Sequence, residues 1–201
     1  MGASGGSPAR RRTASDRVHV VLLEAAQDVL DREGLAGVTV RAVAREAGVA
    51  PMGVYNRFGS KEGLLLALAV RALEDLWYAV SVDPSLEAEE RFRRGCVAYR
   101  RFALAHPQRY ALIFGGGGPV ARTGSEASVH GHAAFDVLVE LVEGVVTRDS
   151  LRRFAGSGEA AQMVWTAIHG AVHLELGGIG GVSGSQDVYE RLIDLLLRGL
   201  R

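Results

Sequence analysis

The amino-acid sequence predicts an all-α protein with about nine helices. Apolar residues recur at the i, i+3, i+4 spacing of one helix face through most of the 201 residues, and almost no segment alternates apolar and polar residues as a strand would. Proline, which interrupts helices, occurs only five times in the chain. We therefore expect helices joined by loops and no sheet.

The composition excludes several classes of protein. A hydrophobic fraction of 48% is sufficient for a buried core, yet no apolar run approaches the ~18 residues of a membrane-spanning helix. The chain starts without the apolar segment of a secretion signal, and its single cysteine, Cys96, has no second cysteine for an internal disulfide. A cytoplasmic protein is expected. The net charge is zero, although residues 1–62 carry nine basic and seven acidic residues, an excess of two positive charges.

The chain is expected to consist of three parts, residues 1–14, 15–62 and 63–201. Residues 1–14 show no periodicity and are predicted to form a disordered arm. Apolar residues then recur at helical spacing over residues 16–33, and Gly34 is expected to end this first helix.

Residues 40–61 predict two short helices separated by a tight turn. The first helix carries a narrow stripe of valine and alanine, and Gly48 suits the left-handed conformation that often follows a helix end. Pro51 suits the first turn of the second helix, because an N–H group there would have no partner within the helix.

The second of these helices has an outward face that does not suit a solvated surface. Val54 and Phe58 are four residues apart and can face inward, which leaves Met52, Tyr55 and Asn56 pointing outward. Asparagine can pair with adenine, an apolar side chain can contact the thymine methyl group, and tyrosine can hold a phosphate. The pattern therefore predicts a helix-turn-helix domain whose second helix lies in the major groove of DNA.

Several residues of this stretch form a set with fixed spacing: Thr39, Ala-x-x-Ala-Gly-Val from Ala44, and Tyr-x-x-Phe-x-x-Lys-Glu-x-Leu from Tyr55. The set resembles the N-terminal domain of the TetR family of bacterial transcriptional repressors, over residues 15–73. The arginines of residues 1–14 would then either touch DNA or only add solubility. The resemblance and the outward face together imply contacts with double-stranded DNA from Thr39, Arg41, Ala50, Pro51, Met52, Gly53, Tyr55, Asn56, Arg57 and Lys61.

The same periodicity predicts six further helices in the C-terminal part. A glycine-rich segment, residues 115–125, is expected to be a loop, and it lacks the context of a nucleotide-binding loop. The last two helices are apolar around more than one face, so a second copy is expected to complete a four-helix interface in a homodimer. Such a dimer would present two recognition helices ~34 Å apart to a palindromic operator. The six ranges are 61–80, 85–105, 108–114, 129–147, 159–176 and 188–200.

Trp165, His169 and Gly170 form a Trp-x-x-x-His-Gly motif. It resembles the C-terminal domain of WHG-type members of the same family, over roughly residues 85–180. The resemblance implies that a small effector, hydrophobic or aromatic, binds between the helices and releases a repressor from DNA. The same side chains can also be ordinary core, and this alternative stays open. The expected ligand-binding residues are Trp77, Phe92, Tyr99, Phe102, Tyr110, Phe114, Phe135, Trp165 and His169.

Two other functions remain as alternatives. His169 and His173 have the i, i+4 spacing that can hold one metal ion, with Glu175 nearby, so a metal-dependent helical protein is one of them. A helical ligand-binding or interaction module without affinity for DNA is the other. The sequence carries no nucleophile motif in a strand-to-helix setting and no clear carboxylate pair, so we expect neither catalysis nor a cofactor or bound metal.

Overall fold

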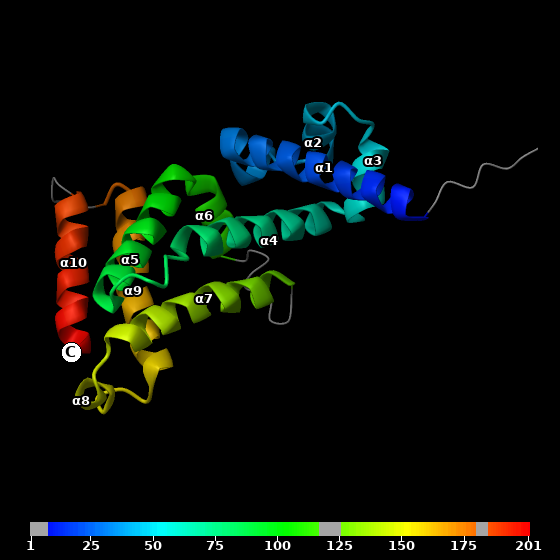
Figure 1. Cartoon of the computed structure of the whole chain (residues 1–201). Helices are drawn as coiled ribbons and strands as arrows, with labels where there is room; N and C mark the ends of the chain where they lie inside the picture. The colour runs from blue at the N-terminus through cyan, green and yellow to red at the C-terminus, as the bar shows by residue number, and fades with distance from the viewer. Residues whose placement is uncertain (1–7, 117–125, 180–184) are drawn as a thin grey trace, which may run out of the picture. The chain divides into compact units, whose positions relative to one another are not determined.

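The computed structural model describes residues 8–116, 126–179 and 185–201, and every regular element in these ranges is an α-helix (Figure 1). Ten helices occur there, one more than expected, and the predicted all-α class is confirmed. No helix in the described ranges combines the length and apolar composition needed to cross a membrane. The chain divides into two compact units, Met1–Val70 and Arg71–Arg201, and this boundary falls within α4 (Lys61–Val80) rather than at its start.

The N-terminal unit is built on α1 (Pro8–Gly37), α2 (Val40–Glu46) and α3 (Pro51–Phe58), with α2 packed against both neighbours. An exposed ion pair of 2.7 Å between Arg32 and Glu46 also joins α1 to α2. Most of the apolar stripes expected from the sequence form one core, although Val18 and Val21 near the start of α1 are about half exposed. The buried side chains include Leu22, Ala26, Val29, Leu30, Val38, Val43, Ala44, Val54, Leu64 and Leu68.

The first helix is longer at its N-terminus than the sequence indicated. It begins at Pro8, so residues 8–14, expected to be disordered, belong to α1, while residues 1–7 lie outside the described part of the chain. Proline is favoured in a first helical turn, and the alanine and arginine that follow are strong helix formers. Gly34 interrupts the regular helix as predicted, with a φ of 70° that other residues rarely adopt.

The C-terminal unit is organised around α5 (Ala88–Ala105), which packs against four other helices. Figure 1 shows α9 and α10 beside it. Phe92, on the inner face of α5, is completely buried. The other helices of this unit are α6 (Pro107–Phe114), α7 (Glu126–Val145), α8 (Arg148–Leu151), α9 (Ser157–Leu176) and α10 (Ser185–Leu200).

Two polar contacts hold the neighbouring helices α9 and α10 against α5. The Tyr189 hydroxyl on α10 donates a buried hydrogen bond of 2.9 Å to the Cys96 carbonyl oxygen. On the α9 side, the Arg100 guanidinium forms two bonds of 2.6 and 2.7 Å with the Glu175 carboxylate. A two-pronged arginine–carboxylate pair restricts orientation as well as distance, so it sets how α5 and α9 lie together.

The short helix α8 was not expected from the sequence. Its N-cap is Thr147, whose hydroxyl accepts a hydrogen bond of 3.2 Å from the Ser150 backbone N–H. Four residues are too few to display a helical period, so only this cap could have indicated the helix. The remaining helices of the C-terminal unit differ from the expected ranges by a few residues at their ends.

Gly95 provides a test of packing between α5 and α7. A Cβ atom added at Gly95 would lie 2.5 Å from Cδ1 of Leu141, too close for an unstrained contact. We expect Gly95→Ala to lower stability in the native chain and to raise it by about 0.5–1 kcal/mol in a Leu141→Ala background, where only the helix propensity of alanine remains. Urea unfolding of the four proteins in this cycle measures the coupling, and strictly additive effects would contradict the contact.

Candidate functional site

The turn between α2 and α3 is shaped by local hydrogen bonds and one glycine. The Thr39 hydroxyl accepts a bond of 3.1 Å from the Ala42 N–H and caps α2, and Thr39 itself is exposed. Gly48 has a φ of 66°, the left-handed conformation predicted at the end of α2. Arg41 lies on the exposed face of α2, so the helix presents its N-terminal cap and this arginine on its surface.

Helix α3 buries a single residue and exposes the side chains predicted to read DNA. Val54 is 1% exposed, whereas Met52 and Tyr55 are 64% and 48% exposed. Ala50, Pro51 and Asn56 are exposed as well, and Phe58 is half-buried. A Cβ atom added at the half-buried Gly53 would meet Val49 only at 3.8 Å, an ordinary contact. The face that points outward is therefore the one that the spacing predicted.

The end of α3 and the start of α4 hold two of the three basic residues of the predicted interface, Arg57 and Lys61. Lys61 is exposed at the first position of α4, where the Ser60 hydroxyl accepts a bond of 3.1 Å from the Gly63 N–H. Arg57 is half-buried instead, and its Nε donates a bond of 2.8 Å to Nδ1 of His19 on α1. This contact could not be predicted from local sequence patterns, because it joins residues 38 positions apart.

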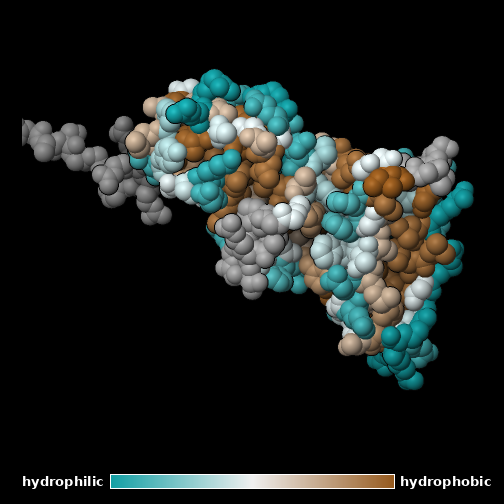
Figure 2. Space-filling model, turned by 180° about the vertical axis from the view of Figure 1, so that it is seen from behind, coloured by the Kyte–Doolittle hydropathy of each residue, from teal (hydrophilic) through white to brown (hydrophobic). Residues whose placement is uncertain are grey.

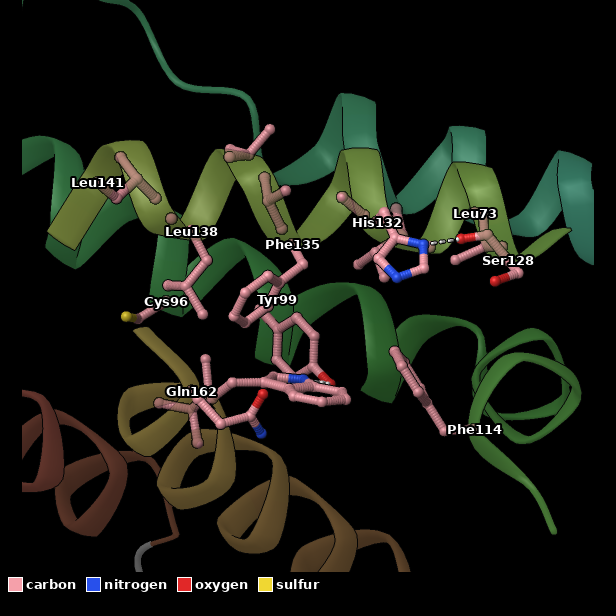
Figure 3. A pocket seen from close by; sticks show the side chains of 18 residues that line it. Leu73, Cys96, Tyr99, Phe114, Ser128, His132, Phe135, Leu138, Leu141 and Gln162 are labelled. Carbon is pink, nitrogen blue, oxygen red and sulfur yellow. Dashed lines mark hydrogen bonds between the residues drawn. The ribbon is translucent and has the colours of Figure 1, made fainter. Parts of the chain in front are cut away.

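A cavity of about 430 Å³ lies in the C-terminal unit among α4, α5, α7 and α9, with Phe114 of α6 at one side (Figure 3). Most of its wall is aliphatic or aromatic, which suits an apolar ligand. Four residues expected to bind a ligand line it: Tyr99, Phe114, Phe135 and Trp165. The lining residues that the sequence did not indicate include Leu73, Leu76, Val80, Cys96, Ser128, His132, Leu138, Leu141 and Gln162.

The other five expected ligand-binding residues do not line this cavity. Phe92 and Phe102 are buried in the packed core around α5. Trp77 borders a separate hollow formed with α7, and Tyr110 and His169 lie behind the cavity wall. Helical period identifies a buried face, but it does not distinguish a face against a cavity from one against other side chains.

Tyr110 and His169 join Tyr99 and Trp165 in a hydrogen-bonded cluster. The Tyr99 and Tyr110 hydroxyl oxygens lie 2.8 and 2.7 Å from Nδ1 of His169, and Trp165 Nε1 donates to the Tyr99 hydroxyl oxygen at 3.4 Å. Burial raises the pKa of Tyr110 to about 12 and raises that of Tyr99 further, so both hydroxyls keep their protons and can donate. The two hydroxyl oxygens also lie 3.3 Å apart, so each hydroxyl can bond to the other as well as to Nδ1 of His169.

The arrangement around His169 does not favour a metal site. The rings of His169 and His173 are stacked 5.9 Å apart, but Glu175 is held by Arg100. Within the described ranges, no group of three or more His, Cys, Asp or Glu residues is arranged to hold a metal ion. Burial also raises the pKa of Cys96 to about 12, so this thiol is not the reactive thiolate that a redox sensor requires.

Comparisons with known proteins identify relatives of both units of the chain. Residues 22–68 match the family model described as bacterial regulatory proteins, tetR family, and residues 92–200 match the one described as tetracyclin repressor-like, C-terminal domain. The chain is 28% identical over 184 residues to the uncharacterized HTH-type transcriptional regulator Rv0681 of Mycobacterium tuberculosis, covering 89% of this chain and 79% of that protein.

Two solved structures extend the likeness to the whole fold. A protein with unknown function from Rhodococcus sp. RHA1 has a TM-score of 0.76 at 26% identity, covering 100% of this chain and 98% of its own. BioQ with its double-stranded DNA operator has a TM-score of 0.62, also at 26% identity, covering 89% of this chain and 94% of its own.

The hydrogen-bonded cluster predicts a pH dependence of stability. Burial, and then the neighbouring His173, lower the pKa of His169 in the folded chain. The unfolded chain therefore binds this proton more readily, and stability falls as the pH decreases below the ordinary histidine pKa of about 6.5. Replacement by glutamine (His169→Gln), which keeps an acceptor for the hydroxyls, should make this loss smaller. The midpoints of urea unfolding at about pH 8 and about pH 5 measure this loss of stability in the native chain and in the variant. An equal loss in both proteins would contradict His169 as its cause.

Proposed function

Because this chain belongs to the TetR family of bacterial transcriptional regulators, we propose that it binds a palindromic operator as a homodimer and that a small, largely apolar effector releases it. The exposed face of α3 is the observation that carries the DNA-binding part of this proposal. The effector part is supported by the apolar cavity of the C-terminal unit. The family to which the chain belongs supports our inference that it acts as a repressor, and DNA as its proposed partner supports a location in the cytoplasm.

The proposed DNA contacts follow from the chemistry of the exposed side chains. Asn56 suits a bidentate pair with adenine, and Met52 suits the methyl group of thymine, so both would read bases together with Ala50, Pro51 and Gly53. Tyr55 and Lys61 suit phosphate oxygens, and Thr39, Arg41 and Arg57 would add contacts of the same kind. Arg57 would do so while its Nε remains held by His19.

Exposed apolar side chains on α9 and α10 support the homodimer. Met163 and Leu174 on α9 are 58% and 51% exposed, and Leu195 on α10 is 59% exposed. A Cβ atom added at Gly170, between the two α9 residues, would meet nothing within 4 Å, so this face of α9 is open. Figure 2 shows hydrophobic side chains gathered on the surface of this part of the C-terminal unit. A second copy would remove these side chains from water.

Helix α4 connects the proposed effector site to the proposed DNA site. Leu73, Leu76 and Val80 of α4 line the cavity, and the same helix begins at Lys61, with two residues between it and the end of α3. A ligand that binds better when these residues take one position shifts the population toward that state. A complete switch from 1:99 to 99:1 requires about 5.5 kcal/mol of difference in binding free energy between the two states.

Selection from a pool of random duplex DNA tests the proposed DNA contacts. The native chain should enrich a palindrome. Asn56→Ala should lose about 1–3 kcal/mol of discrimination at one position of each half-site. Lys61→Ala should keep the same consensus while weakening binding to all sequences, and the slope of log affinity against log salt should fall by about 0.9 per removed phosphate contact.

The matched control for these variants is Arg101→Ala, which removes one exposed positive charge from α5 in the other unit. It should leave both the consensus and the salt slope unchanged. Enrichment of no sequence by the native chain, or an equal effect of all three substitutions, would reject α3 and the start of α4 as the DNA-binding surface.

Introduction of a charged residue on the open face of α9 and α10 tests the proposed dimer. Leu195→Asp should halve the molecular mass measured by light scattering and weaken operator binding, because a carboxylate would be buried without a partner. Val129→Asp, at a side chain on α7 that is 65% exposed, is the control and should leave the mass unchanged. A native chain that is monomeric at concentrations that bind DNA would overturn the homodimer.

A further inference from the structure

The cavity wall contains a histidine with a defined hydrogen-bonding direction. Nδ1 of His132 on α7 lies 2.7 Å from the backbone carbonyl oxygen of Ser128, drawn as a dashed line in Figure 3. A carbonyl oxygen can only accept, so Nδ1 carries the proton and donates it. In the neutral ring Nε2 is then left as an acceptor, on the edge of the ring away from Ser128.

The other polar groups of the wall are uncharged. Among the described lining residues there is no aspartate, glutamate, lysine or arginine. The Tyr99 hydroxyl and the Trp165 N–H already bond within the cluster around His169. A ligand that brought a charge into this cavity would lose its hydration without gaining an opposite charge, which strongly opposes binding.

The apolar part of the wall is rich in aromatic rings. Trp165 has Phe114 at 5.9 Å and Phe135 at 6.1 Å between ring centroids, both at steep interplanar angles. Figure 3 shows Phe135 and His132 following each other along α7, with Phe114 on the opposite side of the view. Rings at such angles offer both faces and edges, an environment that suits an aromatic body in the ligand.

We propose that the cavity binds an uncharged phenol, whose ring lies among Phe114, Phe135 and Trp165 and whose O–H group donates a hydrogen bond to Nε2 of His132. This assignment names the ligand class of the proposed effector site and rests on that part of the proposed function. Because His132 is exposed, the hydroxyl end of the phenol lies at the rim of the cavity and its apolar end lies inside.

Three matched probes test this ligand class by calorimetry on the full chain without DNA, at about pH 8, where a phenol with the pKa of about 10 of a free tyrosine keeps its proton. The probes are para-pentylphenol, its methyl ether and para-pentylbenzoate. The phenol should bind about five- to tenfold tighter than the ether, which has no proton to donate, and the benzoate anion should bind weakest.

Variants of His132 isolate the hydrogen bond from hydrophobicity. His132→Leu should weaken the phenol by about five- to tenfold and leave the ether unchanged, while His132→Gln, which keeps an acceptor, should recover part of the loss. His130→Leu removes a histidine of the same helix outside the lining and is the control. Circular dichroism verifies that each variant is folded.

Several results would overturn the proposal: equal binding of phenol and ether, tightest binding of the benzoate, no binding of any probe, or an equal effect of His132→Leu on phenol and ether. These titrations contain no DNA, so they separate the ligand class from the rest of the proposed function. A failure to enrich a palindrome would reject DNA binding without changing the result of the ligand titrations. A failure of the ligand titrations would reject the phenol without changing the result of the DNA selection.

Discussion

The recognition surface depends on a helix that is too short to be stable alone. Isolated helices of fewer than ~12–15 residues are marginal in water, and α3 has eight residues. It contributes one fully buried side chain, Val54, to the core of the N-terminal unit. Gly48 and Gly59 bound it in left-handed conformations, with φ of 66° and 73°. The orientation of the outward residues of α3 therefore depends on one packed valine, two local turns and the contacts of Arg57 and Phe58 with His19 of α1.

In the C-terminal unit, a densely packed and hydrogen-bonded group of helices lies beside an open cavity. On the dense side, the Tyr99 and Tyr110 hydroxyls meet His169, and Arg100 pairs with Glu175, so directional bonds join α5, α6 and α9. A satisfied polar network of this kind fixes a single arrangement of helices. It resists the collapse that would close the neighbouring cavity. The phenol-binding geometry that we infer thus depends in part on Tyr110, His169, Arg100 and Glu175, which do not themselves line the cavity.

Local features of the sequence were sufficient to predict the helices but not everything about their surroundings. The start of α3 followed from Pro51, because proline is favoured in the first turn of a helix. The start of α1 was missed because its first residues carry no apolar period. The four-residue α8 was missed because its length hides any period.

The candidate sites were predictable to different degrees for the same reason. The outward face of α3 depends only on helix geometry, so Met52, Tyr55 and Asn56 were assigned correctly to the exposed side. The cavity depends on how distant helices meet. Apolar periodicity therefore could not separate Phe135, which lines it, from Phe92, which lies in the core. His132 and Gln162 lie outside any apolar stripe, and only the fold reveals that they face a cavity.

The two walls of the cavity have different consequences for a bound ligand. On the α5 and α9 side, hydrogen bonds to His169 and the Arg100 pair oppose movement. The α4 side contributes Leu73, Leu76 and Val80, three residues on one helix face whose contacts with a ligand are purely apolar and non-directional. A ligand held by its hydroxyl at His132 would therefore press on α4 more readily than on α9. Because only two residues separate α4 from α3, displacement of α4 is the route that we propose for an effect of cavity occupancy on DNA affinity.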